Sequence, residues 1–167
     1  MIEMKKVIVI GCPGSGKSTF SRALHNSTGL PLFHLDMMYW NVDKTTVDKS
    51  VFLERLSDVL SKNEWIIDGN YASTMELRLK ACDMVIFFYY HIVLCLEGIR
   101  ERRGKKRSDM PWIEIEEDEE FVEFVKSFND TQRPYIFELL EKYKNSKQIV
   151  ILKSREEADS FVALKMK

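Results

Sequence analysis

The chain has 167 residues, enough for one domain that buries its own core, and 45% of them are hydrophobic. That share, together with a sequence free of low-complexity tracts, excludes an intrinsically disordered chain. The net charge of −1 excludes binding of polyanions through overall charge, so contact with nucleic acid would require a local basic patch.

The cysteines and the apolar segments indicate a cytoplasmic protein without a membrane partner. Cys12, Cys82 and Cys95 are too few and too widely spaced for a disulfide framework or a zinc site, so we expect reduced thiols. The first residues lack the features of a signal peptide. The most apolar stretch, residues 84–96, is shorter than the roughly 20 residues that cross a bilayer.

A phosphate-binding loop is the most specific motif of the sequence. Residues 11–19 read Gly-Cys-Pro-Gly-Ser-Gly-Lys-Ser-Thr and fit the pattern G-x-x-x-x-G-K-S/T. The apolar run 6–10 before the motif predicts a buried parallel strand, and an apolar face with Phe20 and Leu24 predicts a helix after it. A glycine-rich turn with a chance lysine is the alternative, and the flanking strand and helix favour the phosphate loop.

The residue types of this loop match the chemistry of a nucleotide triphosphate. Glycines let the backbone curl around a phosphate, Lys17 supplies positive charge for the β- and γ-phosphates, and the Ser18 hydroxyl suits Mg²⁺. The expected nucleotide-binding residues are Gly11, Pro13, Gly14, Ser15, Gly16, Lys17, Ser18 and Thr19.

A second strand is predicted at residues 30–35 and ends at Asp36, whose carboxylate would face the ligand crevice of an α/β sheet. Tyr39 and Trp40 follow in a bulky turn, before a helix predicted at about residues 46–62. These two aromatic residues either form a wall of a substrate pocket or belong to the core.

A third strand, residues 64–67, ends in the polar cluster Asp68-Gly69-Asn70-Tyr71. A carboxylate at this position beside a phosphate loop is suited to Mg²⁺ or its bound waters, and a solvated loop is the alternative. Ser73 and Glu76 have the spacing of a capping box and predict a short helix that carries Arg78.

The chain then predicts a fourth strand at residues 84–90 and a helix at about 91–103, followed by a sharp separation of charge. Arginines near a triphosphate would neutralise its charge, whereas basic residues at a helix end can simply be solvated. The basic run comprises Arg100, Arg102, Arg103, Lys105, Lys106 and Arg107, and the acidic run comprises Glu114, Glu116, Glu117, Asp118, Glu119 and Glu120.

The C-terminal part predicts further helices and a fifth strand. The acidic run begins a helix that Pro134 either kinks or separates from the next one. Residues 148–152 form the fifth strand, and Ser154 with Glu157 caps a terminal helix. Strands that alternate with amphipathic helices predict a single α/β domain over residues 1–167, a parallel sheet between two layers of helices.

On these residues the sequence resembles the adenylate and shikimate kinase group of small P-loop NTPases, and more closely the topology modulation protein (FlaR-like) family. The resembling stretches are residues 11–19, 35–40, 65–71 and 103–109. The resemblance implies a five-stranded parallel sheet of order 2-3-1-4-5 and a mobile lid at about residues 100–117. It further implies that Asp36 lies near the acceptor, that Asp68 holds metal-bound water, and that Arg103 and Arg107 close on phosphates.

The sequence departs from adenylate kinases at the acceptor side. Adenylate kinases continue the Asp-Gly of strand three with Phe-Pro-Arg, where this chain has Asn70 and Tyr71, so the nucleoside-monophosphate contact does not carry over. Arg78 is the candidate for replacing the missing arginine. Tyr89 and Tyr90 stand where related kinases often have an aspartate, which further disfavours AMP.

We therefore predict an ATP- and Mg²⁺-dependent phosphotransferase that moves the γ-phosphoryl group to a small-molecule or nucleotide acceptor. The predicted catalytic residues are Lys17, Asp36, Arg103 and Arg107; the predicted metal ligands are Ser18 and Asp68; and the predicted acceptor-binding residues are Asp36, Trp40, Asn70, Tyr71 and Arg78. A nucleotide-dependent protein that binds DNA through the basic run is the alternative, with ATP hydrolysis without an acceptor as a third possibility. The sequence leaves open the acceptor, the choice of ATP over GTP and the oligomeric state.

Overall fold

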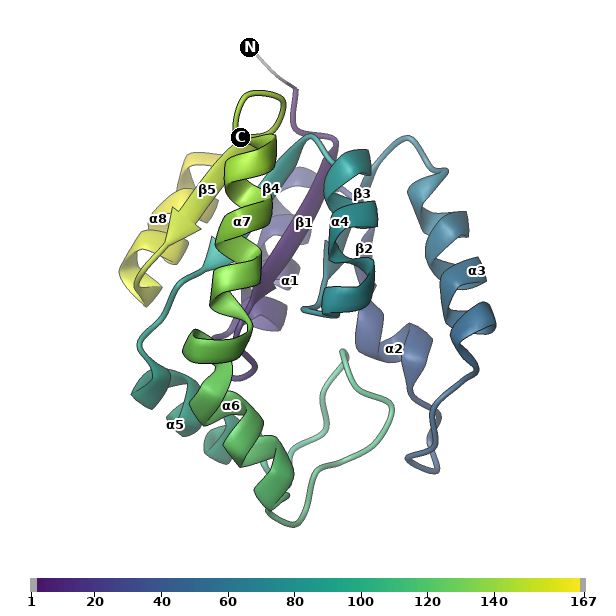
Figure 1. Cartoon of the computed structure of the whole chain (residues 1–167), viewed down its shortest axis with the longest axis vertical. Helices are drawn as coiled ribbons and strands as arrows, with labels where there is room; N and C mark the ends of the chain where they lie inside the picture. The colour runs from purple at the N-terminus through teal and green to yellow at the C-terminus, as the bar shows by residue number, and fades with distance from the viewer. Residues whose placement is uncertain (1–2, 166–167) are drawn as a thin grey trace.

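The computed structural model describes residues 3–165 and has a five-stranded parallel sheet at its centre (Figure 1). The strands are β1 (Lys6–Gly11), β2 (Leu32–His34), β3 (Trp65–Asp68), β4 (Met84–Phe88) and β5 (Gln148–Leu152). Their order, β2-β3-β1-β4-β5, confirms the predicted topology. The central strand β1 pairs with β3, where Val9 lies opposite Asp68, and with β4, where Gly11 lies opposite Phe88.

Helices cover both faces of the sheet, as predicted. In Figure 1, α4 and α7 lie in front of the sheet and α1 and α8 lie behind it. The helices are α1 (Lys17–Thr28), α2 (Leu35–Tyr39), α3 (Lys49–Leu60), α4 (Ala72–Ala81), α5 (Ile92–Arg102), α6 (Glu119–Thr131), α7 (Arg133–Tyr143) and α8 (Arg155–Lys165). Within residues 3–165, none of these helices has the length and apolarity needed to cross a membrane.

The core forms because three strands are apolar along nearly their whole length, the exceptions being Lys6 at the start of β1 and Asp68 at the end of β3. Every residue of β3 and β4 is buried, as are all residues of β1 after Lys6. Each large apolar side chain that leaves water contributes roughly 1.5–3 kcal/mol to folding. The sheet is therefore a rigid platform, and the loops at the carboxyl ends of its strands carry the polar residues.

Several predicted boundaries shift in ways that matter for the site. The second strand is only three residues long, and Asp36 lies in the first turn of the short helix α2 rather than at a strand end. The third strand includes Asp68 as its last residue. Pro134 separates two helices rather than kinking one, since it occupies the first turn of α7, where a missing N–H does no harm.

The capping box predicted at Ser73 and Glu76 is wrong. Helix α4 begins earlier, at Ala72, and no side chain caps it. Glu76 instead accepts hydrogen bonds from Lys142 Nζ (2.5 Å) and the Tyr143 hydroxyl (2.8 Å) of α7. The glutamate thus joins α4 to α7, and its two partners lie 66 and 67 positions away in the sequence.

Candidate nucleotide and acceptor site

The predicted phosphate loop joins β1 to α1 and curls tightly. Gly14 and Gly16 have φ values of 83° and 91°, in the left-handed region that favours glycine. The Ser15 hydroxyl donates to the Cys12 carbonyl (2.7 Å), which closes the curl from inside. Gly16 precedes α1 without a side-chain cap, so the first N–H groups of the helix are available to an anion.

Lys17 places a partly buried ammonium group at this helix end. Its Nζ donates to the Cys12 carbonyl (3.0 Å), which leaves further donors for a ligand. Burial lowers the pKa of Lys17 below its usual 10.5, although the Asp68 carboxylate acts in the opposite direction. An ammonium group withdrawn from water gains most from a bound anion, as a triphosphate would supply.

The loop is fitted closely to α5. A Cβ added to Gly14 would lie 2.1 Å from the Cys95 carbonyl oxygen, and one added to Gly98 would lie 1.9 Å from the Gly14 oxygen. Backbone therefore meets backbone with no room for a methyl group. The sequence motif identified Gly14, but nothing in the sequence pointed to Gly98.

The two predicted metal ligands line the same cavity. The Ser18 hydroxyl accepts a hydrogen bond from Arg22 Nη1 (2.9 Å), and Asp68 Oδ2 accepts one from His34 Nδ1 (2.9 Å). Residues 3–165 contain no group of three or more acidic, histidine or cysteine side chains arranged around one metal ion. One hydroxyl and one carboxylate fit Mg²⁺, which usually takes few protein ligands and completes its shell with phosphate oxygens and waters.

Across the cavity from the phosphate loop, Asp36 lies among aromatic rings. Its Oδ1 accepts a hydrogen bond from the Tyr71 hydroxyl. Burial raises the pKa of Asp36 above its usual 3.8, although the Tyr71 hydrogen bond acts in the opposite direction. Tyr39 packs edge-on against Trp40 and Tyr71, with ring centroids 5.5 and 5.1 Å apart. The Tyr71 hydroxyl thus holds the carboxylate at the cavity wall, and the packing of Tyr39 on Tyr71 supports that ring.

Asn70 and Arg78 have different roles from each other. Asn70 lines the cavity, and its Oδ1 accepts from the Gly11 N–H (3.2 Å), which ties the ends of β1 and β3 together. Arg78 is fully buried and lies outside the cavity lining. Its guanidinium group donates to the carbonyls of Gly69 (3.0 Å) and Tyr71 (2.8 Å). The placement of Arg78 contradicts the predicted substrate contact, because the guanidinium supports the loop from beneath.

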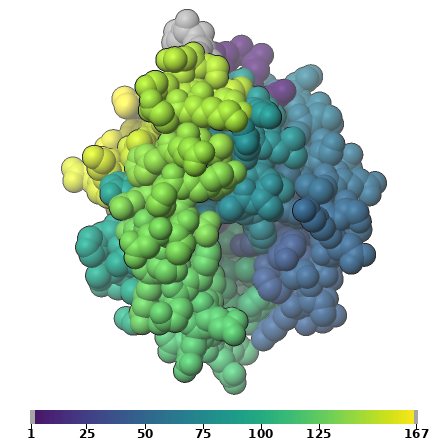
Figure 2. Space-filling model, in the orientation of Figure 1, coloured from purple at the N-terminus to yellow at the C-terminus, as the bar shows by residue number. Residues whose placement is uncertain are grey.

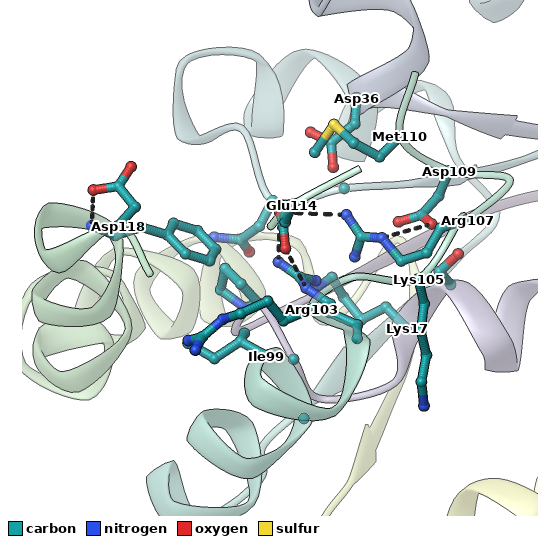
Figure 3. Close-up of a pocket in the computed structure, with 18 of the residues that line it drawn as sticks. Lys17, Asp36, Ile99, Arg103, Lys105, Arg107, Asp109, Met110, Glu114 and Asp118 are labelled. Atoms are coloured by element: carbon teal, nitrogen blue, oxygen red, sulfur yellow. Dashed lines mark hydrogen bonds and ion pairs between the residues drawn. The ribbon is translucent and has the colours of Figure 1, made fainter. Parts of the chain in front are cut away.

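The predicted arginines lie on the segment 103–118, which joins α5 to α6 and extends toward α2 (Figure 1). Arg107 lies between Asp109 (Nε–Oδ1 3.7 Å) and Glu114 (Nη2–Oε1 3.4 Å), as Figure 3 shows. Arg102, at the end of α5, also pairs with Glu114 (Nε–Oε2 3.3 Å). Arg103 lies farther from this cluster, 3.8 Å from Glu117. The Glu114 carboxylate thus pairs with the guanidinium groups of both Arg102 and Arg107.

A cavity of about 1240 Å³ brings most predicted residues together. Figure 2 shows the hollow between the green atoms of α6 and the blue atoms near α2. The predicted residues that line it are Pro13, Gly14, Gly16, Lys17, Ser18, Thr19, Asp36, Trp40, Asp68, Asn70, Tyr71, Arg103 and Arg107. Gly11 and Ser15 lie outside the lining, since Gly11 ends β1 and Ser15 is buried within the loop.

The sequence analysis missed several residues of this cavity. Arg22 follows Ser18 by four positions on α1, a spacing that places both on one helical face and was available as a signal. Arg102 belonged to the basic run but was not singled out. Asp109 and Trp112 carried no signal, because only the course of the segment 103–118 brings them to the cavity.

The sheet order and the phosphate loop between β1 and α1 define an α/β P-loop NTPase fold. Among solved structures, shikimate kinase from Bacteroides thetaiotaomicron is similar, with TM-score 0.62, 20% identity, and coverage of 97% of this chain and 96% of that one. Shikimate kinase from Acinetobacter baumannii in complex with shikimate has TM-score 0.64, 14% identity and coverage of 96% and 90%. A gluconokinase from Sinorhizobium meliloti 1021 has TM-score 0.56, 15% identity and coverage of 96% and 92%.

No family model matches the chain, and no curated protein matches it. The sheet order and the similarity to the solved shikimate kinase structures establish the fold of the small P-loop kinases. The narrower resemblance to the topology modulation family stays a prediction.

Proposed function

We propose that this protein is an ATP- and Mg²⁺-dependent phosphotransferase that transfers the γ-phosphoryl group to a small acceptor. The observation that carries the proposal is that Lys17, at the phosphate loop, and Asp36, at the start of α2, line the same cavity. A triphosphate held by the first and an acceptor held by the second would be neighbours. The fold shared with shikimate kinases and a gluconokinase supports the same class of reaction.

In this mechanism the chain supplies position and charge. Lys17 and the N–H groups that open α1 hold the β- and γ-phosphates, and Ser18 and Asp68 hold Mg²⁺. Bound Mg²⁺ neutralises charge on the phosphate oxygens. Arg103 and Arg107 complete the neutralisation when the segment 103–118 closes as a lid.

Asp36 orients the acceptor and takes its proton. The acceptor oxygen forms a bond to the γ-phosphorus while the bond from that phosphorus to the β–γ bridging oxygen breaks, so ADP leaves. The acceptor proton passes to the Asp36 carboxylate. A raised pKa makes this carboxylate a stronger base than an exposed aspartate, and the Tyr71 hydroxyl keeps it aimed.

A screen for ADP release over nucleosides, nucleotides and small metabolites tests the proposal, with Lys17→Ala as the variant. We expect acceptor-dependent release by the native protein and none by Lys17→Ala at an unchanged melting temperature. Lys126→Ala, which removes an exposed lysine of α6 that does not line the cavity, is the matched control. Equal turnover by Lys17→Ala and the control would refute the assignment.

Arg107→Ala separates transition-state stabilisation from nucleotide binding. Loss of one charge-stabilising donor typically lowers kcat by roughly 10²–10³-fold. We expect such a loss with a much smaller change in the Kd for the ATP analogue. Equal losses in both quantities would contradict a role in the transition state.

The DNA-binding alternative has less support. Arg102 and Arg107 are directed to Glu114 inside the cavity, where a duplex backbone could not reach them. Salt-sensitive binding of duplex DNA without acceptor-dependent turnover would favour that alternative.

A further inference from the structure

Arg22 lines the cavity from α1, but the proposed mechanism gives it no role. Its Nη1 atom donates to two hydroxyl oxygens, Ser18 Oγ (2.9 Å) and Ser108 Oγ (3.0 Å). Its Nη2 atom donates to Thr19 Oγ1 (3.3 Å). Ser18 is the proposed Mg²⁺ ligand, and Ser108 belongs to the segment 103–118 that would close as a lid. A single nitrogen atom thus joins the metal side of the phosphate loop to the proposed lid.

The guanidinium group of Arg22 is held by neutral groups. Within residues 3–165 its hydrogen-bond partners are the three hydroxyls, and it forms no ion pair with a carboxylate. Arg107, by contrast, is paired with Asp109 and Glu114. A hydroxyl holds a guanidinium group less strongly than a carboxylate does, and Arg22 is only half-buried. Its bonds can therefore be given up when a stronger competitor arrives.

Mg²⁺ and Arg22 would compete for one oxygen atom. The Ser18 hydroxyl suits Mg²⁺ as a hard oxygen, and this oxygen already accepts a hydrogen bond from Arg22. The ion would bring a second positive charge to the same atom, which repels the guanidinium group. Burial and the Arg22 charge both act to lower the pKa of His34, whose Nδ1 bonds to Asp68, so Arg22 lies near the second proposed ligand as well. Binding of Mg²⁺ with the triphosphate therefore requires Arg22 to withdraw.

This withdrawal would reach the lid. Because Nη1 makes both bonds, Arg22 cannot leave Ser18 without disturbing its bond to Ser108. Among residues 3–165, that bond is the one side-chain hydrogen bond between α1 and the segment 103–118. The segment is held elsewhere by Trp112, whose ring lies 5.8 Å from the ring of Trp40 at the end of α2. Arg22 is thus the polar link between the lid and the metal side of the cavity.

We infer that Arg22 is a positioning residue that occupies Ser18 and holds the segment 103–118 against α1 until Mg²⁺ and nucleotide arrive. It acts through Ser18 and Ser108 and does not touch the reacting atoms. Its displacement frees the segment to close over the phosphates, and the competition at Ser18 sets how strongly nucleotide binding depends on metal. The inference rests on the proposed phosphotransferase function.

Titration calorimetry with a non-hydrolysable ATP analogue, in Mg²⁺ and in EDTA, tests the competition with Arg22→Met. This variant keeps a long side chain and removes the charge and its donors. We expect its Kd in Mg²⁺ to fall by roughly fivefold to tenfold, because the bond to Ser18 no longer has to be broken. Its Kd in EDTA should not fall, since no ion then needs the Ser18 oxygen. The matched control is Arg100→Met, at an exposed position of α5 outside the cavity lining, and both of its constants should stay within about twofold.

The outcomes separate this inference from the proposed function. Absence of nucleotide binding by the native protein in both conditions would overturn the proposed function and this inference with it. With nucleotide binding intact, an unchanged or raised Kd of Arg22→Met in Mg²⁺ would overturn the inference alone. An equal fall in Mg²⁺ and in EDTA would do the same, because the gain would then be independent of the metal.

Limited trypsin digestion of the nucleotide-free protein tests the link to the lid. Lys105 and Lys106 are exposed on the segment 103–118 and provide cleavage sites. Cleavage after them should be roughly twofold to fivefold faster in Ser108→Ala and in Arg22→Met than in the native protein, and unchanged in Arg100→Met. Ser108→Ala should keep its Kd in Mg²⁺ within about twofold, because Arg22 still contacts Ser18. Cleavage at the native rate in both site variants would overturn the link between Arg22 and the lid.

Discussion

Glu114 holds two guanidinium groups that line the cavity, including that of Arg107, which the proposed mechanism brings to the triphosphate. Its carboxylate lies 3.3 Å from Arg102 Nε and 3.4 Å from Arg107 Nη2, and the three side chains are 15–21% exposed. A phosphate group is an anion that arginine binds through two N–H groups, as it binds a carboxylate, and it can bind these arginines only after Glu114 leaves them. Glu114→Gln therefore removes a competitor from inside the site.

The expected size of this effect follows from the two ion pairs. Each contributes about 1 kcal/mol after the cost of desolvation is subtracted. Two pairs together give about 2 kcal/mol, and each 1.4 kcal/mol corresponds to a tenfold change in Kd. Glu114→Gln should therefore lower the Kd for the ATP analogue by roughly tenfold to thirtyfold.

Titration calorimetry with Mg²⁺ and the ATP analogue measures this change. Glu116→Gln is the control, because it removes the same charge from the same segment at a position to which no ion pair is assigned within residues 3–165. The double variant Arg102→Gln/Glu114→Gln should bind the ATP analogue less tightly than Glu114→Gln alone. Tighter binding in both glutamate variants alike would show a general effect of charge, and weaker binding in Glu114→Gln would refute the competition.

Three further predictions concern the frame around the site. Gly98→Ala should lower the free energy of unfolding by about 1–3 kcal/mol and weaken nucleotide binding, because its methyl group would displace Gly14; urea unfolding and calorimetry measure both. Arg78→Met should lower the free energy of unfolding by about 2 kcal/mol, because the carbonyls of Gly69 and Tyr71 lose their donor and removal of the buried charge offsets only part of that loss. An unchanged urea midpoint would contradict a stabilising role for Arg78. In the native protein, the fall of kcat/KM at acid pH should occur above pH 3.8, because the pKa of Asp36 is raised. This fall should be missing from the residual activity of Asp36→Asn, which a pH series of kcat/KM measures.

His34 gives a pH dependence of stability with a definite sign. Burial acts to lower its pKa, but the hydrogen bond and the charge of Asp68 outweigh burial and raise the pKa above the usual 6.5. Because the folded state binds the proton more tightly, the stabilisation is fully present below about pH 6.5 and declines as the pH rises through the folded-state pKa. Urea unfolding at a series of pH values should show this decline, and His34→Gln should remove it.

The sheet and the phosphate loop could be predicted because local patterns specify them. Apolar runs such as residues 6–10 and 84–88 are buried wherever they pair, and the glycine pattern allows few other conformations. Asp68 and Asn70 could be placed for a related reason, since the carboxyl ends of parallel strands meet at one edge of the sheet, whereas Asp36 lies just beyond its strand, in the first turn of α2.

The remaining features depend on contacts between distant segments. Arg78 looks like any helical arginine in the sequence, and only the packing of α4 under residues 69–71 reveals its burial. Gly98 lies in a helix, where glycine is usually unfavourable, but the close approach of Gly14 becomes visible only in three dimensions. Asp109 and Trp112 belong to a segment without regular structure, so no periodicity could indicate which way they face.

The connection between α5 and α6 has a consequence for the order of events during turnover. Gly104, with a φ of 75°, donates its N–H to the Glu114 carbonyl, so the two arms of this connection are joined near its base. Arg107 and Asp109, only two positions apart, lie on the loop beyond that junction. On the proposed function, the triphosphate displaces the Glu114 carboxylate before Arg107 can reach the phosphates, so nucleotide binding precedes closure of this loop.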